Sequence, residues 1–306
     1  MWSSDEIRHE LAAIAPARRC DRLAELSALF HTAGTLHLRG CGRVALHLDL
    51  SSSAVARRAF LLLRELGVAS EIRTYRQRAF AHATRYQLHV DGSEATLPVL
   101  SEAGIVSAGG APRLRPPKRV VGRECCRAAY VRGALLGAGS VSGPRSPHLE
   151  IRCASLEAAE LLVRVAALDD VAVRARDRGR HALVYAKRTD AIAELLALAG
   201  ASDAALAVDE QGVVGAARAH ANRLANADQA NLVRASRAAG VQLRAVRQLA
   251  ENGTLETLPV TLREIADLRL RHPSLSLREL AAKCRPPTTK ASVHRRLARL
   301  VRLAQP

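Results

Sequence analysis

The chain has 306 residues, 48% of them hydrophobic, and a formal net charge of +17. This length suits two domains with apolar cores, no apolar run is long enough to cross a bilayer, and the polar, acidic residues 1–6 are unlike a signal peptide. We therefore expect a cytoplasmic protein with an anionic partner, most often nucleic acid, and not a membrane or secreted protein.

The positive charge is unevenly distributed along the chain. Residues 217–306 contain 17 Lys and Arg against 6 Asp and Glu, whereas residues 1–216 contain 29 against 23. No acidic residue follows Glu279. A general bias towards Arg would not concentrate charge in this way, so the C-terminal part is the predicted electrostatic contact surface.

The cysteines form no Cys-x-x-Cys pair; they are Cys20, Cys41, Cys125, Cys126, Cys153 and Cys284. In a cytoplasmic chain, scattered thiols are expected to be reduced and buried. A zinc site is the less favoured alternative, and we expect neither a metal nor another cofactor.

Residues 20–36 and 125–141 share one pattern, a helix-forming run that ends in Ala-Gly and continues into β-branched residues. The segments that follow are also parallel, so that each copy is predicted to contain a helix, two strands, a helix and two strands. In the first copy the second helix is predicted over residues 51–67, between strands at 46–50, 71–75 and 79–90. In the second copy it is predicted over residues 155–168, between strands at 148–152, 171–176 and 181–187. The copies span about residues 15–100 and 120–198.

The first helix of each copy carries small residues four positions apart, Ala28 and Thr32 in one and Gly133 and Gly137 in the other. This spacing places them on one helical face and allows two backbones to approach closely. We therefore predict that the two helices pair about a pseudo-two-fold axis inside a monomer.

These two helices, which end in Ala33-Gly34 and Ala138-Gly139, resemble the LAGLIDADG motifs of homing endonucleases. Residues 131–142 and 148–151 resemble the WhiA family of sporulation and cell-division regulators still more closely. The resemblance implies an α+β, two-repeat LAGLIDADG homing-endonuclease-like domain over residues 1–215. An all-α domain over residues 220–306, with a linker helix and a helix-turn-helix, would follow it. A second transcription regulator would be a natural partner.

In active LAGLIDADG nucleases, an acidic residue precedes the last glycine of each motif, and the two carboxylates hold divalent metal. Here those positions are Ala33 and Ala138, and an alanine methyl binds no metal. Glu25 lies two turns back, and a lone His31 is more typical of packing or surface than of catalysis. We therefore predict that the protein is not an enzyme and does not cut DNA.

Six arginines on or near the helix and strands of the first copy suit two roles equally. They could contact phosphates or simply solvate the surface; they are Arg57, Arg58, Arg73, Arg76, Arg78 and Arg85.

The Gly-containing stretch 199–215 is expected to be a loop between domains. Asp228 is then expected to cap a helix that runs through residues 233–250. Asn222, Arg223, Asn226, Asp228 and Asn231 match a pattern of the family, and their role is open.

Three short helices are predicted after this stretch, over residues 259–271, 277–283 and 290–303. Ser276 and Glu279 form a capping box for the second, and Thr289 can cap the third. In a helix-turn-helix, the N-terminal half of the second helix enters the major groove. Candidates for base contact are Thr288, Thr289, Lys290, Ser292, His294 and Arg295, and candidates for phosphate contact are Arg296, Arg299 and Arg302.

These features together predict a sequence-specific regulator of transcription that binds double-stranded DNA in the nucleoid and acts in bacterial cell division or sporulation. Three alternatives stay open. One is a nuclease that recruits acids from elsewhere. Another is an adaptor that binds protein or RNA through the repeat domain. The third is a basic helix that docks on an acidic protein or membrane surface.

Overall fold

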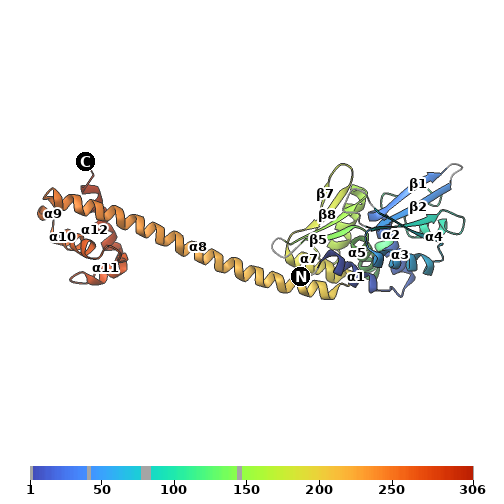
Figure 1. Cartoon of the computed structure of the whole chain (residues 1–306), viewed down its shortest axis with the longest axis horizontal. Coiled ribbons are helices and arrows are strands. Elements are labelled where there is room, and N and C mark those ends of the chain that lie inside the picture. The colour runs from blue at the N-terminus through green and yellow to red at the C-terminus, as the bar shows by residue number, and fades with distance from the viewer. Residues whose placement is uncertain (1–2, 40–42, 77–83, 143–146, 306) are drawn as a thin grey trace. The chain divides into compact units, whose positions relative to one another are not determined.

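The computed structural model describes residues 3–39, 43–76, 84–142 and 147–305 (Figure 1). The chain divides into two compact units, Met1–Ala216 and Ala217–Pro306, each with its own hydrophobic core. Within the described ranges, no helix is both long and apolar enough to span a bilayer.

The first unit contains both predicted copies, and the order of elements predicted for each is confirmed (Figure 1). After α1 (Ser4–Ala13), the first copy comprises α2 (Arg19–Ala33), β1 (Gly34–Arg39), β2 (Arg43–Leu50), α3 (Ser53–Glu65), β3 (Glu71–Arg76), β4 (Thr84–Asp91) and α4 (Leu97–Glu102). The second comprises η1 (Lys118–Val121), α5 (Glu124–Ala138), β5 (Gly139–Ser142), β6 (His148–Cys153), α6 (Leu156–Ala167), β7 (Arg174–Asp177), β8 (Ala182–Ala186) and α7 (Thr189–Ala199). The mixed α+β class is therefore correct.

Each copy forms a four-stranded antiparallel sheet, with strand orders β1-β2-β4-β3 and β5-β6-β8-β7. The register pairs Leu48 with Leu88 and Ile151 with Val184, all four fully buried against the helices. Successive side chains of a strand point to opposite faces. Each sheet therefore has one apolar face towards the helices and one polar outer face.

The helices α2 and α5 pack against each other, as the spacing of small residues predicted. A Cβ atom added at Gly133 would collide with the backbone carbonyl oxygen of Glu25, and one at Gly137 would collide with the Thr32 hydroxyl oxygen. Because no side chain larger than hydrogen fits at Gly133, the backbones of the two helices come into direct contact there. This pair is the centre of the first unit.

A buried ion cluster joins the elements around this pair. The Glu25 carboxylate on α2 accepts hydrogen bonds from Arg58 Nε on α3 (2.9 Å) and from Arg132 Nε on α5 (2.8 Å). Arg132 also donates to the carbonyl of Ala199 at the end of α7 (3.3 Å). Arg58 is 4% exposed, so both surface roles proposed for it are wrong. Its charge is needed inside the protein to compensate Glu25.

The predicted loop over residues 199–215 is wrong, because α8 (Ser202–Glu251) is one continuous helix of 50 residues. The helix also runs through Asp228, which therefore caps nothing. The actual break is Gly200, whose φ of 96° places it in the left-handed conformation that ends α7. Gly212 and Gly215 each cost only about 1 kcal/mol inside a helix, and the many Ala residues around them favour it.

In the second unit, α8 is followed by α9 (Thr254–Thr257), α10 (Val260–Arg271), α11 (Leu277–Lys283) and α12 (Lys290–Leu303). The three short helices predicted from the sequence are confirmed. Their core includes Val246, Leu249 and Ile265.

The buried cluster predicts that Glu25→Gln strongly destabilises the first unit, because it leaves Arg58 and Arg132 buried without a counter-charge. Removing one partner of a buried ion pair costs about 3–5 kcal/mol of unfolding free energy. Urea unfolding followed by circular dichroism measures this loss. The matched control is Glu102→Gln, whose partner is Arg19 in an ion pair about half exposed on both sides. That change should cost less than about 1 kcal/mol. Equal effects of the two substitutions would contradict the role given to Glu25.

The contact between α2 and α5 predicts that Gly133→Ala lowers the free energy of unfolding by about 1–3 kcal/mol, because the added methyl forces the helices apart. Gly215→Ala is the control, since its Cβ would have no neighbour within 4 Å. We expect the control to stabilise α8 by about 0.5–1 kcal/mol, the gain of Ala over Gly inside a helix. The same urea titration compares the two variants. If Gly133→Ala leaves the free energy of unfolding unchanged, the close contact between the helices does not contribute to stability.

Candidate nucleic-acid interface

The starts of α11 and α12 are fixed by the caps that the sequence predicted. The Ser276 hydroxyl accepts from the Glu279 amide (3.3 Å), while the Glu279 carboxylate accepts from the Ser276 amide (2.7 Å). The Ser276 side chain and then its amide, by hydrogen bonding to the carboxylate, hold the pKa of Glu279 below its usual value. The Thr289 hydroxyl accepts from the Ser292 amide (3.2 Å) and opens α12. The amide of Thr288 donates to the carbonyl of Ala281 (3.0 Å), which closes the turn.

The two helices share one apolar contact. Val293, Leu297 and Leu300 on α12 are buried in the same core as Leu280 and Ala281 on α11. This matches the packing predicted from the sequence. Because one face of α12 is committed to this core, its opposite face is left to the solvent.

The exposed face of α12 carries most of the predicted DNA-contacting residues. Exposed positions are Thr289, Lys290, His294, Arg295, Arg299 and Arg302, while Thr288 and Ser292 are half-buried. Lys290, Arg295, Arg299 and Arg302 form no ion pair with any residue that the structure describes. Their charges are therefore available to an anionic partner.

Arg296 differs from the other predicted residues. Its Nη1 atom lies 4.0 Å from Glu264 Oε2 on α10, and both side chains are about a quarter exposed. The other carboxylate oxygen of Glu264 accepts from the Arg285 amide (2.6 Å). Arg296 therefore contributes first to the packing of α12 on α10.

Arg269 was not identified from the sequence. It is 2% exposed on α10, and Nη1 donates to the carbonyls of Leu275 (2.8 Å) and Pro273 (3.3 Å) in the turn before α11. Burial lowers its pKa. Its spacing in the sequence could have predicted this burial, because Arg269 follows Leu262, Ile265 and Ala266 on the apolar face of the helix. Arg269 positions α11, and through it α12.

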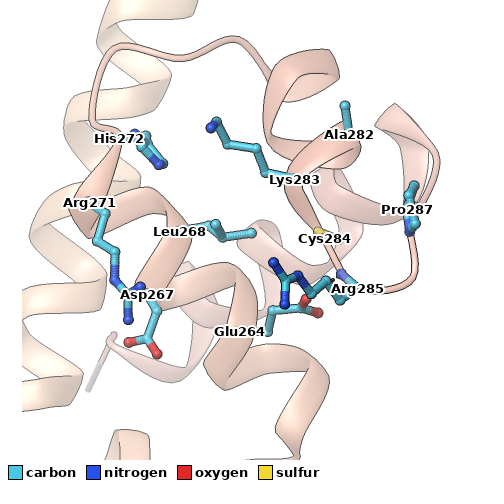
Figure 2. Close-up of a pocket in the computed structure, with 10 residues that line it drawn as sticks. All are labelled: Glu264, Asp267, Leu268, Arg271, His272, Ala282, Lys283, Cys284, Arg285 and Pro287. Atoms are coloured by element: carbon cyan, nitrogen blue, oxygen red, sulfur yellow. Dashed lines mark hydrogen bonds between the residues drawn. The ribbon is translucent and has the colours of Figure 1, made fainter.

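A hollow lies between α10 and the end of α11 (Figure 2). Ten residues line it, namely Glu264, Asp267, Leu268, Arg271, His272, Ala282, Lys283, Cys284, Arg285 and Pro287. Acidic and basic groups are mixed around the hollow, so it does not favour an anion. It also lacks the largely apolar lining that is typical of small-molecule sites.

The two positions that the LAGLIDADG resemblance matched to nuclease carboxylates lie at the ends of the central helices, where Ala33 ends α2 and Ala138 ends α5. Glu25 is held by its two arginines. His31 is buried, with Nδ1 2.7 Å from the carbonyl oxygen of Ser27 and Nε2 3.2 Å from that of Arg113. Burial lowers the pKa of His31. His31 is thus a packed residue, as the sequence favoured.

The outer face of the first sheet is largely neutralised by its own acids. Arg85 Nε lies 3.5 Å from Asp49, whose carboxylate also accepts from the Tyr75 hydroxyl (2.8 Å), and Arg73 pairs with Glu71 (3.1 Å). Arg57 and Arg76 are exposed, and Arg78 lies outside the described residues.

The outer face of the second sheet is more basic and was missed in the sequence. Arg152, Arg174, Arg176 and Lys187 are exposed there, while Glu150 faces His148 at 2.7 Å. The signal was available as alternating basic positions in the predicted strands. This face is a second surface suited to an anion.

Comparison with known proteins identifies relatives over nearly the whole chain. Three family models match: the WhiA N-terminal LAGLIDADG-like domain over residues 19–106, the WhiA LAGLIDADG-like domain over residues 127–218 and the WhiA C-terminal HTH domain over residues 221–304. The probable cell division protein WhiA of Heliobacterium modesticaldum is 36% identical, over 100% of this chain and 96% of that protein. The protein of the same name from Symbiobacterium thermophilum is 35% identical, over 98% of this chain and 96% of that protein.

A solved structure has the same architecture. The crystal structure of full-length WhiA from Thermotoga maritima covers 99% of this chain and 98% of that chain, with a TM-score of 0.57 and 23% identity. At this identity the likeness concerns the fold alone. It supports the combination of a LAGLIDADG-like domain with a C-terminal helical domain.

Proposed function

The chain belongs to the WhiA family, and from this premise we propose that it is a sequence-specific regulator of transcription that binds double-stranded DNA and does not cut it. The regulated processes would be cell division or sporulation. The observation that carries the proposal is α12, an exposed basic helix held on α11 in a matched helix-turn-helix domain.

The N-terminal half of α12 would enter the major groove. Arg295 can bind guanine through two parallel hydrogen bonds, while Thr289, Lys290 and His294 offer further polar contacts. Thr288 and Ser292 are half-buried at the edge of this surface. Arg299 and Arg302 lie further along the exposed face, where phosphate contact would give affinity without sequence information. Arg296 would serve DNA only by turning away from Glu264.

The absence of nuclease activity is proposed from Ala33 and Ala138. Metal-assisted hydrolysis of a phosphodiester needs hard oxygen ligands to hold Mg²⁺ and activate water. Neither methyl can supply one. Glu25, the nearby carboxylate on α2, is fully buried and already neutralised by two arginines.

The protein would act as a monomer in the cytoplasm, associated with the nucleoid, because the two copies in one chain already form the pseudo-symmetric pair. A second transcription regulator as partner stays a prediction of the family resemblance. The alternative function is an adaptor that binds protein or RNA through the repeat domain. The basic outer face of the second sheet favours this alternative.

Capture of genomic DNA fragments tests the proposal directly. Full-length protein would be incubated with fragmented genomic DNA in Mg²⁺ at about 150 mM salt, where non-specific binding is weakened. The bound fragments would then be sequenced with their ends. We expect enrichment of a common motif in uncut fragments. Cleaved ends would contradict the absence of nuclease activity. Uniform recovery without a motif would favour the adaptor.

Two substitutions on α12 separate base contact from phosphate contact. Arg295→Ala should cost about 1–3 kcal/mol on the captured motif and relax its specificity. Arg299→Ala should weaken binding to all sequences and reduce the slope of log K against log salt by about 1. Arg164→Ala, which removes the same charge from α6, is the control. Fluorescence anisotropy at several salt concentrations measures all three. If the control weakens binding as much as Arg299→Ala, α12 is not the interface.

A further inference from the structure

Four ligand side chains meet at the N-terminal ends of the two central helices. Cys20 and Asp21 lie in the first turn of α2, and Cys125 and Cys126 lie in the first turn of α5. One potential ligand atom of each residue, a thiol sulfur or a carboxylate oxygen, lies within 4.8 Å of the other three. The described residues hold no other such group of three or more His, Cys, Asp and Glu.

The internal repeat explains how the cluster forms. Cys20 and Cys125 occupy equivalent positions in the two copies, as do Asp21 and Cys126. Each copy therefore supplies two adjacent potential ligands, and the close pairing of α2 with α5 brings the two pairs together. Neither copy could complete such a site alone, and the sequence contains no Cys-x-x-Cys motif that would predict it.

The distances suit a small tetrahedral ion. With zinc–sulfur bonds of about 2.3 Å, two tetrahedral ligands lie about 3.8 Å apart. The sulfurs of Cys125 and Cys126 are 4.0 Å apart, and Cys20 Sγ is 3.3 Å from Asp21 Oδ1. The remaining ligand atoms of the group lie within 4.8 Å of one another, so the side chains would move closer together on binding one ion.

We propose that Cys20, Asp21, Cys125 and Cys126 bind one zinc ion that ties the two repeats together. Three thiolates with one carboxylate favour zinc over Mg²⁺ or Ca²⁺, which prefer all-oxygen ligand sets. Four protein ligands leave no open coordination position, so the ion is structural and supports no hydrolysis. The site is distinct from Ala33 and Ala138, which lie at the opposite ends of the same helices.

The surroundings favour the negative charge that such a site requires. The N-terminal ends of α2 and α5 both carry partial positive charge towards the cluster, which stabilises thiolates. Cys125, Arg18 and Arg123 also line an open depression, which gives an ion access from solvent.

The zinc content of full-length protein tests the proposal. Protein purified with a thiol reductant would be equilibrated with Zn²⁺, freed of excess metal and analysed by mass spectrometry for zinc per chain. We expect about one ion per chain, and a rise in the thermal unfolding midpoint that a chelator reverses. Replacement by Co²⁺ should give the visible and thiolate charge-transfer bands of a tetrahedral sulfur site.

Two variants and one control assign the ligands. Cys125→Ser and Asp21→Asn change half-buried residues and should fold, but Cys125→Ser should lose the stoichiometric zinc and Asp21→Asn should hold it more weakly. Cys153→Ser is the control, since that buried thiol lies outside the cluster, on the carbonyl of Ile151. It should keep one zinc per chain.

Three results would overturn the proposal. The first is wild-type protein that retains no zinc, and the second is a Co²⁺ spectrum without thiolate bands. The third is a disulfide between Cys20 and Cys125 or Cys126 in the purified protein that persists when zinc is offered with reductant, which would make the cluster a redox pair instead.

Discussion

The direct contact between α2 and α5 determines most of the first unit. Gly133 and Gly137 permit it, because any larger side chain at either position would collide with α2. Both helices lead straight into the first strand of a sheet, at Gly34 and Gly139, so their pairing also sets where the two sheets begin. The same contact buries Glu25 and gathers the cysteines at the other end of the helices.

The buried carboxylate of Glu25 shows how the fold uses charge internally. It compensates two arginines from different elements, and one of those also binds the end of α7. Such a cluster is costly to desolvate and costly to break, so it favours one arrangement of the helices over others. It also removes Glu25 and Arg58 from any role at the surface, so the proposed DNA contact would fall to groups that the interior does not need.

Local signals in the sequence predicted local structure correctly. The small-residue spacing, the capping box at Ser276 and the cap at Thr289 each depend on residues a few positions apart, and the repeat is a comparison of two such local patterns. One error came from reading single residues, and the others came from contacts between residues far apart in the sequence. Glycines at 212 and 215 suggested a loop, yet they lie inside α8, since helix propensity is a weak guide to a single position. The burial of Arg58 and Arg269 depends on partners from other elements. The cysteines meet only because two copies 105 residues apart pack together.

If the protein binds DNA as proposed, the charges of the two units imply different contributions to affinity and to sequence specificity. On the first sheet, Asp49 and Glu71 already form ion pairs with Arg85 and Arg73, so that face offers little net attraction to phosphates. Arg152, Arg174 and Arg176 on the second sheet, and Arg295 and Arg299 on α12, form no ion pair with any residue that the structure describes. Only α12 combines such groups with a narrow, cylindrical shape that fits the major groove and reaches base edges. Contacts from the second sheet would therefore add affinity to any sequence, while the choice of sequence would rest on α12.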